Sequence, residues 1–183
     1  MKAALLVIDM QNDFILPGGV LEVRGIRNGL EKLRHFIADA RKKKILVIYT
    51  RHCFSKKNNP VEAKLFPNAT NKLKKNSPGW QICPLLTPKD DIIIDKTRYD
   101  TFFKTRLDKL LRKMKIDTLI ITGTMTNICC ESTARSAMYR DYNVIFCSDL
   151  TFCSSAAVQK NTLGTIRSHF GKVMNSRTIS KQL

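Results

Sequence analysis

The chain has 183 residues, of which 43% are hydrophobic, and its formal net charge is +17 at pH 7. This length supports one substantial core but not two domains of ordinary size, so we expect a single domain over residues 1–183. No stretch approaches the roughly 18 consecutive apolar residues of a membrane span, and no export signal is recognisable, which predicts a soluble, cytoplasmic protein without a membrane partner.

Five short apolar runs predict buried strands, because they lack the polar alternation of a half-exposed sheet. In chain order these runs are Ala3–Ile8, Ile45–Tyr49, Ile92–Ile94, Thr118–Thr122 and Val144–Cys147.

Amphipathic segments alternate with these runs. Apolar residues recur at helical spacing over 26–40 and again over 107–114, where residues 105–108 resemble a capping box. A weaker helical pattern covers 154–168, and a sixth strand is expected after Gly171. Such alternation indicates an α/β fold of three αβα layers around a mostly parallel, twisted sheet.

The segment from Arg51 to Pro88 breaks this alternation. It holds most of the chain's prolines, many lysines and asparagines, and little periodicity. Long loops inside compact domains are usually functional, so we expect this excursion to carry part of a binding site.

The positive charge raises the question of a nucleic-acid partner, for which a surplus of Lys and Arg is the usual footprint. Here the basic residues are spread over 41–44, 56–57, 72–75 and 104–115, with few aromatics between them. A lysine-rich solvated surface is therefore favoured and nucleic-acid binding is not expected, although a basic binding or scaffolding protein stays as an alternative.

The six cysteines show neither Cys-x-x-Cys spacing nor the density of a disulfide scaffold. Free thiols are therefore expected. Redox sensing through the adjacent Cys129 and Cys130 is disfavoured, because neighbouring residues rarely close a disulfide without strain.

Three reactive side chains follow the carboxyl ends of predicted strands, the edge at which open parallel sheets bind ligands. Asp9 follows the first strand, Lys96 the third and Cys129 the fourth. Singly, each has an ordinary interpretation: a turn-capping Asp, a Lys that reaches solvent and a small buried Cys. Because all three are expected at the same edge of the sheet, a catalytic role is about as well supported as these ordinary interpretations.

Cys129 also lies where a helix is expected to begin, with Thr126 or Asn127 as its cap. The helix dipole and the Lys96 cation would lower the thiol pKa, and Asp9 could accept the thiol proton and pass it to a leaving amine.

These segments resemble the isochorismatase-like cysteine hydrolases over nearly the whole chain, closest to the ureidoacrylate and N-carbamoyl amidohydrolase branch. The similar blocks are Leu5–Phe14 with Asp9, Gly79–Pro84, Ile94–Phe102 with Lys96, Thr122–Arg135 with Cys129, and Val144–Asp149.

The resemblance implies acyl transfer to Cys129, with Asp9 as general base and then acid and Lys96 as electrostatic support. It implies an oxyanion hole from the backbone N–H groups of Met125 and Cys129, and a cis peptide between Thr124 and Met125. It also implies a small-molecule substrate, a homo-oligomer and no cofactor. The implied substrate-binding residues are Gln11, Phe14, Trp80, Tyr99, Phe102 and Asn127.

Nicotinamidases of this family bind a metal through an Asp and several His after the second strand. This chain has only His52 there, with His35 and His169 elsewhere, so no metal site is expected and His52 is interpreted as a loop or pocket residue. A nicotinamidase-like amidase stays as an alternative. Ser136 stands where many ureido-cleaving relatives have Asp, which leaves the exact substrate open.

Overall fold

A computed structural model describes residues 1–54, 57–65 and 72–183. Its sheet has six strands in the order β3-β2-β1-β4-β5-β6, and every neighbouring pair is parallel, which confirms the predicted fold class. The strands are β1 (Ala3–Ile8), β2 (Leu46–His52), β3 (Ile92–Lys96), β4 (Thr118–Thr124), β5 (Asn143–Phe152) and β6 (Lys172–Met174).

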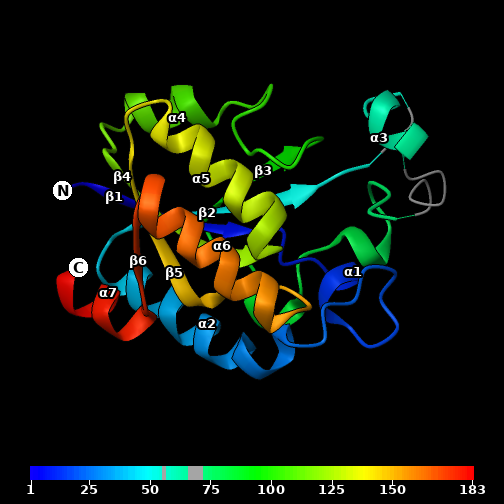
Figure 1. Ribbon diagram of the computed structural model, residues 1–183, viewed down its shortest axis with the longest axis horizontal. Coiled ribbons are helices and arrows are strands. Elements are labelled where there is room, and N and C mark those ends of the chain that lie inside the picture. Colours follow the sequence, from blue (N-terminus) through cyan, green and yellow to red (C-terminus); the bar gives the residue numbers. More distant parts are fainter. Residues whose placement is uncertain (55–56, 66–71) are drawn as a thin grey trace.

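Helices cover both faces of this sheet (Figure 1). The α-helices are α1 (Asn12–Ile15), α2 (Ile26–Lys42), α3 (Pro60–Leu65), α4 (Leu107–Lys113), α5 (Glu131–Met138), α6 (Ala156–His169) and α7 (Ser176–Gln182). Shorter helical turns are the 3-10 helices η2 (Pro78–Trp80) and η3 (Pro84–Leu86) and the π-helix η4 (Thr126–Cys130).

The central strand β1 divides the core in two, because successive side chains of a strand point to opposite faces. Leu5 and Val7 pack with the apolar stripe of α2 and with α7. Ala4, Leu6 and Ile8 pack with α4, α5 and α6 on the other face. Every one of these five side chains is fully buried, so β1 is the middle of a three-layer structure.

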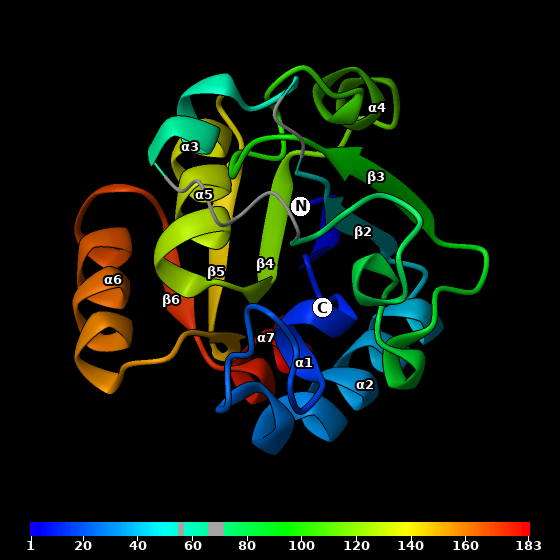
Figure 2. The same ribbon diagram turned by 90° about the vertical axis from the view of Figure 1, so that its right-hand side faces the viewer.

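The order of the strands reverses direction between β1 and β4. The chain runs outward from β1 through β2 to β3, and then from β4 through β5 to β6 on the other side. The carboxyl ends of β1 and β4 therefore flank the switch point, where open α/β sheets bind ligands. Figure 2 looks onto this edge, with α1 below the strands and α3 overlapping α5.

The predicted strands are all present, and helices lie at 26–42, 107–113 and 156–169 as the periodicity predicts. The predicted capping box over residues 105–108 is wrong. The Thr105 hydroxyl accepts a hydrogen bond from Leu107 N–H at 3.2 Å, but Asp108 accepts one from the Tyr142 hydroxyl instead of closing the box.

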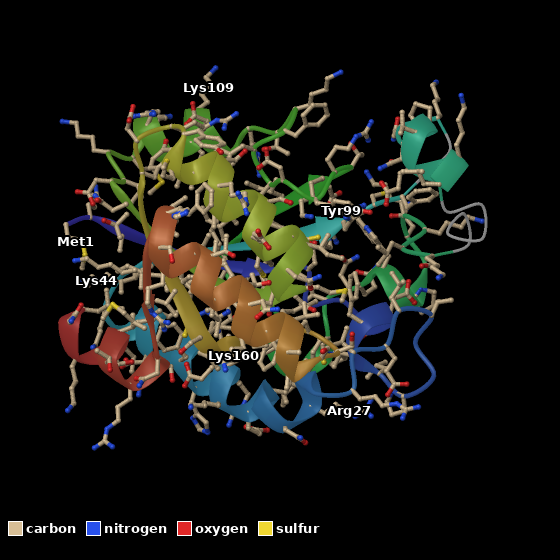
Figure 3. All side chains as sticks on the ribbon, in the orientation of Figure 1. Met1, Arg27, Lys44, Tyr99, Lys109 and Lys160 are labelled. Atoms are coloured by element: carbon tan, nitrogen blue, oxygen red, sulfur yellow. The ribbon has the colours of Figure 1, made fainter. Side chains whose placement is uncertain are left out.

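Part of the predicted excursion over Arg51–Pro88, residues 55–56 and 66–71, lies outside the described residues, and so does Lys56 of the basic clusters. Within the described ranges, no helix is long and apolar enough to cross a membrane. Arg27, Lys44, Lys109 and Lys160 project outward from separate parts of the molecule (Figure 3).

Candidate active site

Asp9 is held in place by the strand beside it. Its backbone has a left-handed φ of 51°, which an Asp tolerates better than most residues and which turns the chain immediately after β1. The Thr50 hydroxyl of β2 accepts a hydrogen bond from the Asp9 N–H at 3.1 Å and donates one to Asp9 Oδ1 at 2.6 Å. The carboxylate is fully buried, and its second oxygen is left for other partners.

Lys96 supplies the charge that balances Asp9. Its Nζ lies 2.7 Å from Asp9 Oδ2, and both side chains are completely buried. The same ammonium donates to the carbonyl oxygens of Arg98 at 3.0 Å and Tyr99 at 3.1 Å. Burial alone would lower the pKa of Lys96, but the Asp9 carboxylate and Cys129 outweigh it and raise that pKa above its ordinary value. Lys96 is therefore a fixed cation.

Cys129 reaches the same point from β4. The peptide between Thr124 and Met125 is cis, as the resemblance implies, and the chain then enters η4, which carries Cys129 and continues into α5. The Cys129 side chain is 4% exposed, and its Sγ lies within 4.8 Å of an Asp9 carboxylate oxygen. The structure thus brings the predicted trio of Asp9, Lys96 and Cys129 together at one end of the sheet.

Two expectations about this loop are wrong. Cys129 does not begin an α-helix capped by Thr126 or Asn127, because it lies within a π-helix whose first turn has no side-chain cap. The pKa of the Cys129 thiol is raised, not lowered: burial is the largest cause, and the Asp9 carboxylate adds to it against the opposing effect of Lys96. The Cys129 thiol is therefore protonated at rest and lies beside a carboxylate that can take its proton.

His52, the last residue of β2, is the residue whose importance the sequence understated. Its ring is 2% exposed, and one ring nitrogen lies within 4.8 Å of both Cys129 Sγ and an Asp9 oxygen. Burial, reinforced by the Lys96 charge, lowers the pKa of His52 to about 3, so the imidazole is neutral at physiological pH.

Asp9, His52 and Cys129 offer an oxygen, a nitrogen and a sulfur atom that a metal ion could use. The residues do not fit a resident cation, however. The Lys96 ammonium already lies 2.7 Å from the Asp9 carboxylate, and a divalent ion there would face that buried positive charge. These side chains therefore do not match a metal centre.

Gln11 joins the loops around this site. Its Nε2 donates to the carbonyl oxygens of His52 at 3.0 Å and Trp80 at 2.9 Å, and its Oε1 accepts from His52 N–H at 2.8 Å. These contacts are all with main chain. Gln11, predicted to bind substrate, therefore fixes the positions of His52 and Trp80.

The other predicted pocket residues divide into core and rim. Phe14 and Phe102 are buried in opposite core clusters. Trp80 is buried under the Arg51 guanidinium, 3.7 Å from its ring centroid. Tyr99 is at the rim beside the carboxyl ends of the strands (Figure 3), with its ring 5.8 Å from that of His52. Asn127 is half-buried on η4, two residues before Cys129.

The chain as a whole is similar to proteins of known family. The family model described as the isochorismatase domain matches residues 3–178. A cysteine hydrolase from Pseudomonas syringae pv. phaseolicola 1448A is 33% identical, with a TM-score of 0.95 over 99% of this chain and 92% of that chain.

Two further solved structures carry named activities. N-carbamoylsarcosine amidase from Thermoplasma acidophilum is 26% identical, with a TM-score of 0.85 over 96% of this chain and 97% of that one. Pyrazinamidase of Pyrococcus horikoshii, solved in complex with zinc, is also 26% identical, with a TM-score of 0.86 over 96% of this chain and 99% of that one.

Proposed function

The chain belongs to the isochorismatase family of hydrolases, and on that premise we propose that it cleaves the C–N bond of a small amide, ureido or carbamoyl compound through a thioester on Cys129. The observation that carries this proposal is the buried trio: a thiol, a carboxylate within 4.8 Å of it and an ammonium 2.7 Å from that carboxylate. Amide hydrolysis is also the activity named for the Thermoplasma acidophilum relative.

In the first half of the reaction, Cys129 Sγ attacks the carbonyl carbon while Asp9 takes the thiol proton. The raised pKa of the Cys129 thiol makes this transfer necessary, since little thiolate exists beforehand. The negative charge that develops on the carbonyl oxygen would be held by the Met125 and Cys129 N–H groups. The C–N bond then breaks, and the amine or ammonia leaves with the proton from Asp9.

In the second half, water attacks the Cys129 thioester and gives its proton to Asp9. The C–S bond breaks, and the thiolate recovers that proton as the acid product leaves. Lys96 stays protonated throughout, because its pKa is raised, and it stabilises the Asp9 carboxylate each time that group is ionised. A ureido substrate would yield a carbamic acid, which decomposes to an amine and carbon dioxide.

The decisive measurement is ammonia release from N-carbamoylglycine, succinamate and nicotinamide. The wild type should release ammonia from at least one of them, and Cys129→Ala should release none. Cys130→Ala is the matched control, since Cys130 is equally buried next to the nucleophile but serves the core, and it should keep most of the activity. Retained turnover in Cys129→Ala would refute the mechanism.

A second candidate is a nicotinamidase-like activity, favoured by the likeness to the Pyrococcus horikoshii pyrazinamidase. Nicotinamide turnover exceeding that of both other substrates would support it. Silence of the folded protein on every substrate would instead favour the basic binding or scaffolding alternative.

A further inference from the structure

His52 stands beside the reacting atoms, yet the mechanism above gives it no task. It pairs in register with Lys96 across β2 and β3, so the two side chains emerge at the same level of the sheet. Gln11 holds its backbone from both sides, through His52 N–H at 2.8 Å and His52 O at 3.0 Å. The fold therefore fixes the position of the His52 backbone beside the site.

The ring also has an unmet hydrogen bond. His52 Nε2 is buried and has no hydrogen-bond partner among the residues that the structure describes. Buried polar atoms are nearly always paired, and an unpaired one calls for an explanation such as an absent ligand. The polar groups near it already have other hydrogen-bond partners. Lys96 Nζ has three acceptors, and Asp9 Oδ1 accepts a hydrogen bond from the Thr50 hydroxyl.

The distances place the His52 ring near the substrate. A carbonyl carbon ready for attack lies about 3–3.5 Å from the nucleophile. A ring nitrogen of His52 lies within 4.8 Å of Cys129 Sγ, so the atoms bonded to that carbon come within hydrogen-bonding reach of the imidazole. The carbonyl oxygen has the proposed oxyanion hole, and the leaving nitrogen has Asp9. The substituent that remains is the one on the far side of the carbonyl.

We infer that His52 accepts a hydrogen bond from a substrate N–H on the far side of the scissile carbonyl, and so selects ureido and carbamoyl compounds over simple amides. A neutral imidazole has one nitrogen with a free lone pair. Burial, reinforced by the Lys96 charge, lowers the pKa of His52, so the ring is neutral and offers this lone pair. A ureido compound offers an N–H at this place, whereas a simple amide offers carbon. This inference rests on the proposed function.

The expected discrimination follows from the cost of leaving a buried polar atom unpaired. A site built around such an atom rejects an analogue that cannot pair with it, by about 10- to 100-fold for one neutral hydrogen bond. Ureido carbonyls are intrinsically less electrophilic than amide carbonyls, so a preference for them would come from the protein.

The test compares N-carbamoylglycine with succinamate, which differ only in that an NH group of the first is a methylene in the second. We expect the wild type to favour N-carbamoylglycine in kcat/KM by about 10- to 100-fold. His52→Leu should bring the ratio to one or below, mainly by loss on N-carbamoylglycine. His52→Gln, whose amide reaches the position of Nε2, should restore part of the preference, and Cys130→Ala should keep the wild-type ratio.

Each other outcome is decisive. An equal loss on both substrates in His52→Leu, or no preference in the wild type, would overturn the inference and leave the hydrolase intact. Hydrolysis of nicotinamide but of neither of these two substrates would overturn this inference alone, whereas hydrolysis of none of the three would overturn the proposed function and this inference with it. If His52→Leu fails to fold by circular dichroism, the wild-type ratio and the ratio of His52→Gln decide the question.

Discussion

The Thr50 hydroxyl makes two hydrogen bonds with one residue: it accepts from the Asp9 N–H at 3.1 Å and donates to Asp9 Oδ1 at 2.6 Å. Both residues are fully buried, at the ends of neighbouring parallel strands. The pair of bonds fixes the Asp9 carboxylate in one orientation and leaves Oδ2 for Lys96, 2.7 Å away. Thr50 is therefore a positioning residue for the proposed general base.

Thr50→Val keeps the shape of the side chain and removes both hydrogen bonds. We expect kcat to fall by about tenfold with little change in KM, because the base loses its orientation, and the free energy of unfolding to fall by about 1–3 kcal/mol. Thr122→Val is the matched control, since the buried Thr122 hydroxyl donates only to Leu6 O at 2.8 Å. Urea unfolding should show that it also lowers stability, while ammonia release shows kcat unchanged. An equal loss of kcat in both variants would contradict the positioning role.

Asp9→Asn separates the two effects of that carboxylate on Cys129. The proton acceptor is lost, so we expect hydrolysis to fall by at least about 100-fold. The negative charge that raises the pKa of Cys129 is lost as well, and Lys96, which lowers it, remains. Alkylation of Cys129 by iodoacetamide at pH 8, followed by peptide mass spectrometry, should therefore become faster as turnover disappears. Slower alkylation in the variant would show that Asp9 activates the thiol in the resting enzyme.

The fold could be predicted from the sequence to the extent that buried strands are apolar. The predicted start and end of β1 are those observed, whereas β2, β3 and β4 extend past the predicted ends to His52, Lys96 and Thr124. These terminal residues are polar but buried. A strand predicted from its apolar residues ends where such polar residues begin. The prediction therefore omits the last residues of these strands, which are the ones that line the candidate site.

The three residues of the trio could be predicted because each follows a recognisable strand. The direction of the pKa shift of Cys129 could not. The expected low pKa of Cys129 assumed a helix terminus and a dominant Lys96 charge. The structure instead buries the thiol against Asp9 within a π-helix. Thr50 and His52 gave only a weak signal, since a polar residue at the end of a strand is common, and their roles depend on contacts between strands distant in the chain.

Gly123 is required where β4 approaches β1. Its φ of 112° lies in the region that L side chains rarely adopt, and an added Cβ would lie 2.1 Å from the Ile8 carbonyl oxygen. We expect Gly123→Ala to lower the free energy of unfolding by at least about 2 kcal/mol, and to lower turnover because the loop to Cys129 must shift. Gly164→Ala on α6, where a Cβ meets nothing within 4 Å, should instead stabilise the protein by up to about 1 kcal/mol. Urea unfolding that places both variants on the same side of the wild type would contradict this assignment.

The buried neutral His52 should make stability depend on pH. Its pKa is lowered to about 3 in the folded protein, mainly by burial, against about 6.5 in an unfolded chain. Between these values the unfolded state binds more protons, so the free energy of unfolding falls as the pH falls below 6.5, by about 1.4 kcal/mol per pH unit from this group. Urea unfolding from pH 7 to pH 5 should show that His52→Gln loses this component of the slope.

The control for that measurement is His35→Gln, because the His35 side chain is exposed on α2 and its ring nitrogen contacts the exposed side chains of Arg34 and Glu31. This variant shows how the loss of an exposed histidine by itself changes the profile. Carboxylates titrate in the same range in all three proteins, so only the difference between profiles reports on the histidine. Parallel profiles for the wild type and His52→Gln would mean that His52 becomes protonated in the folded protein, and a cationic imidazole could not accept the substrate hydrogen bond inferred above.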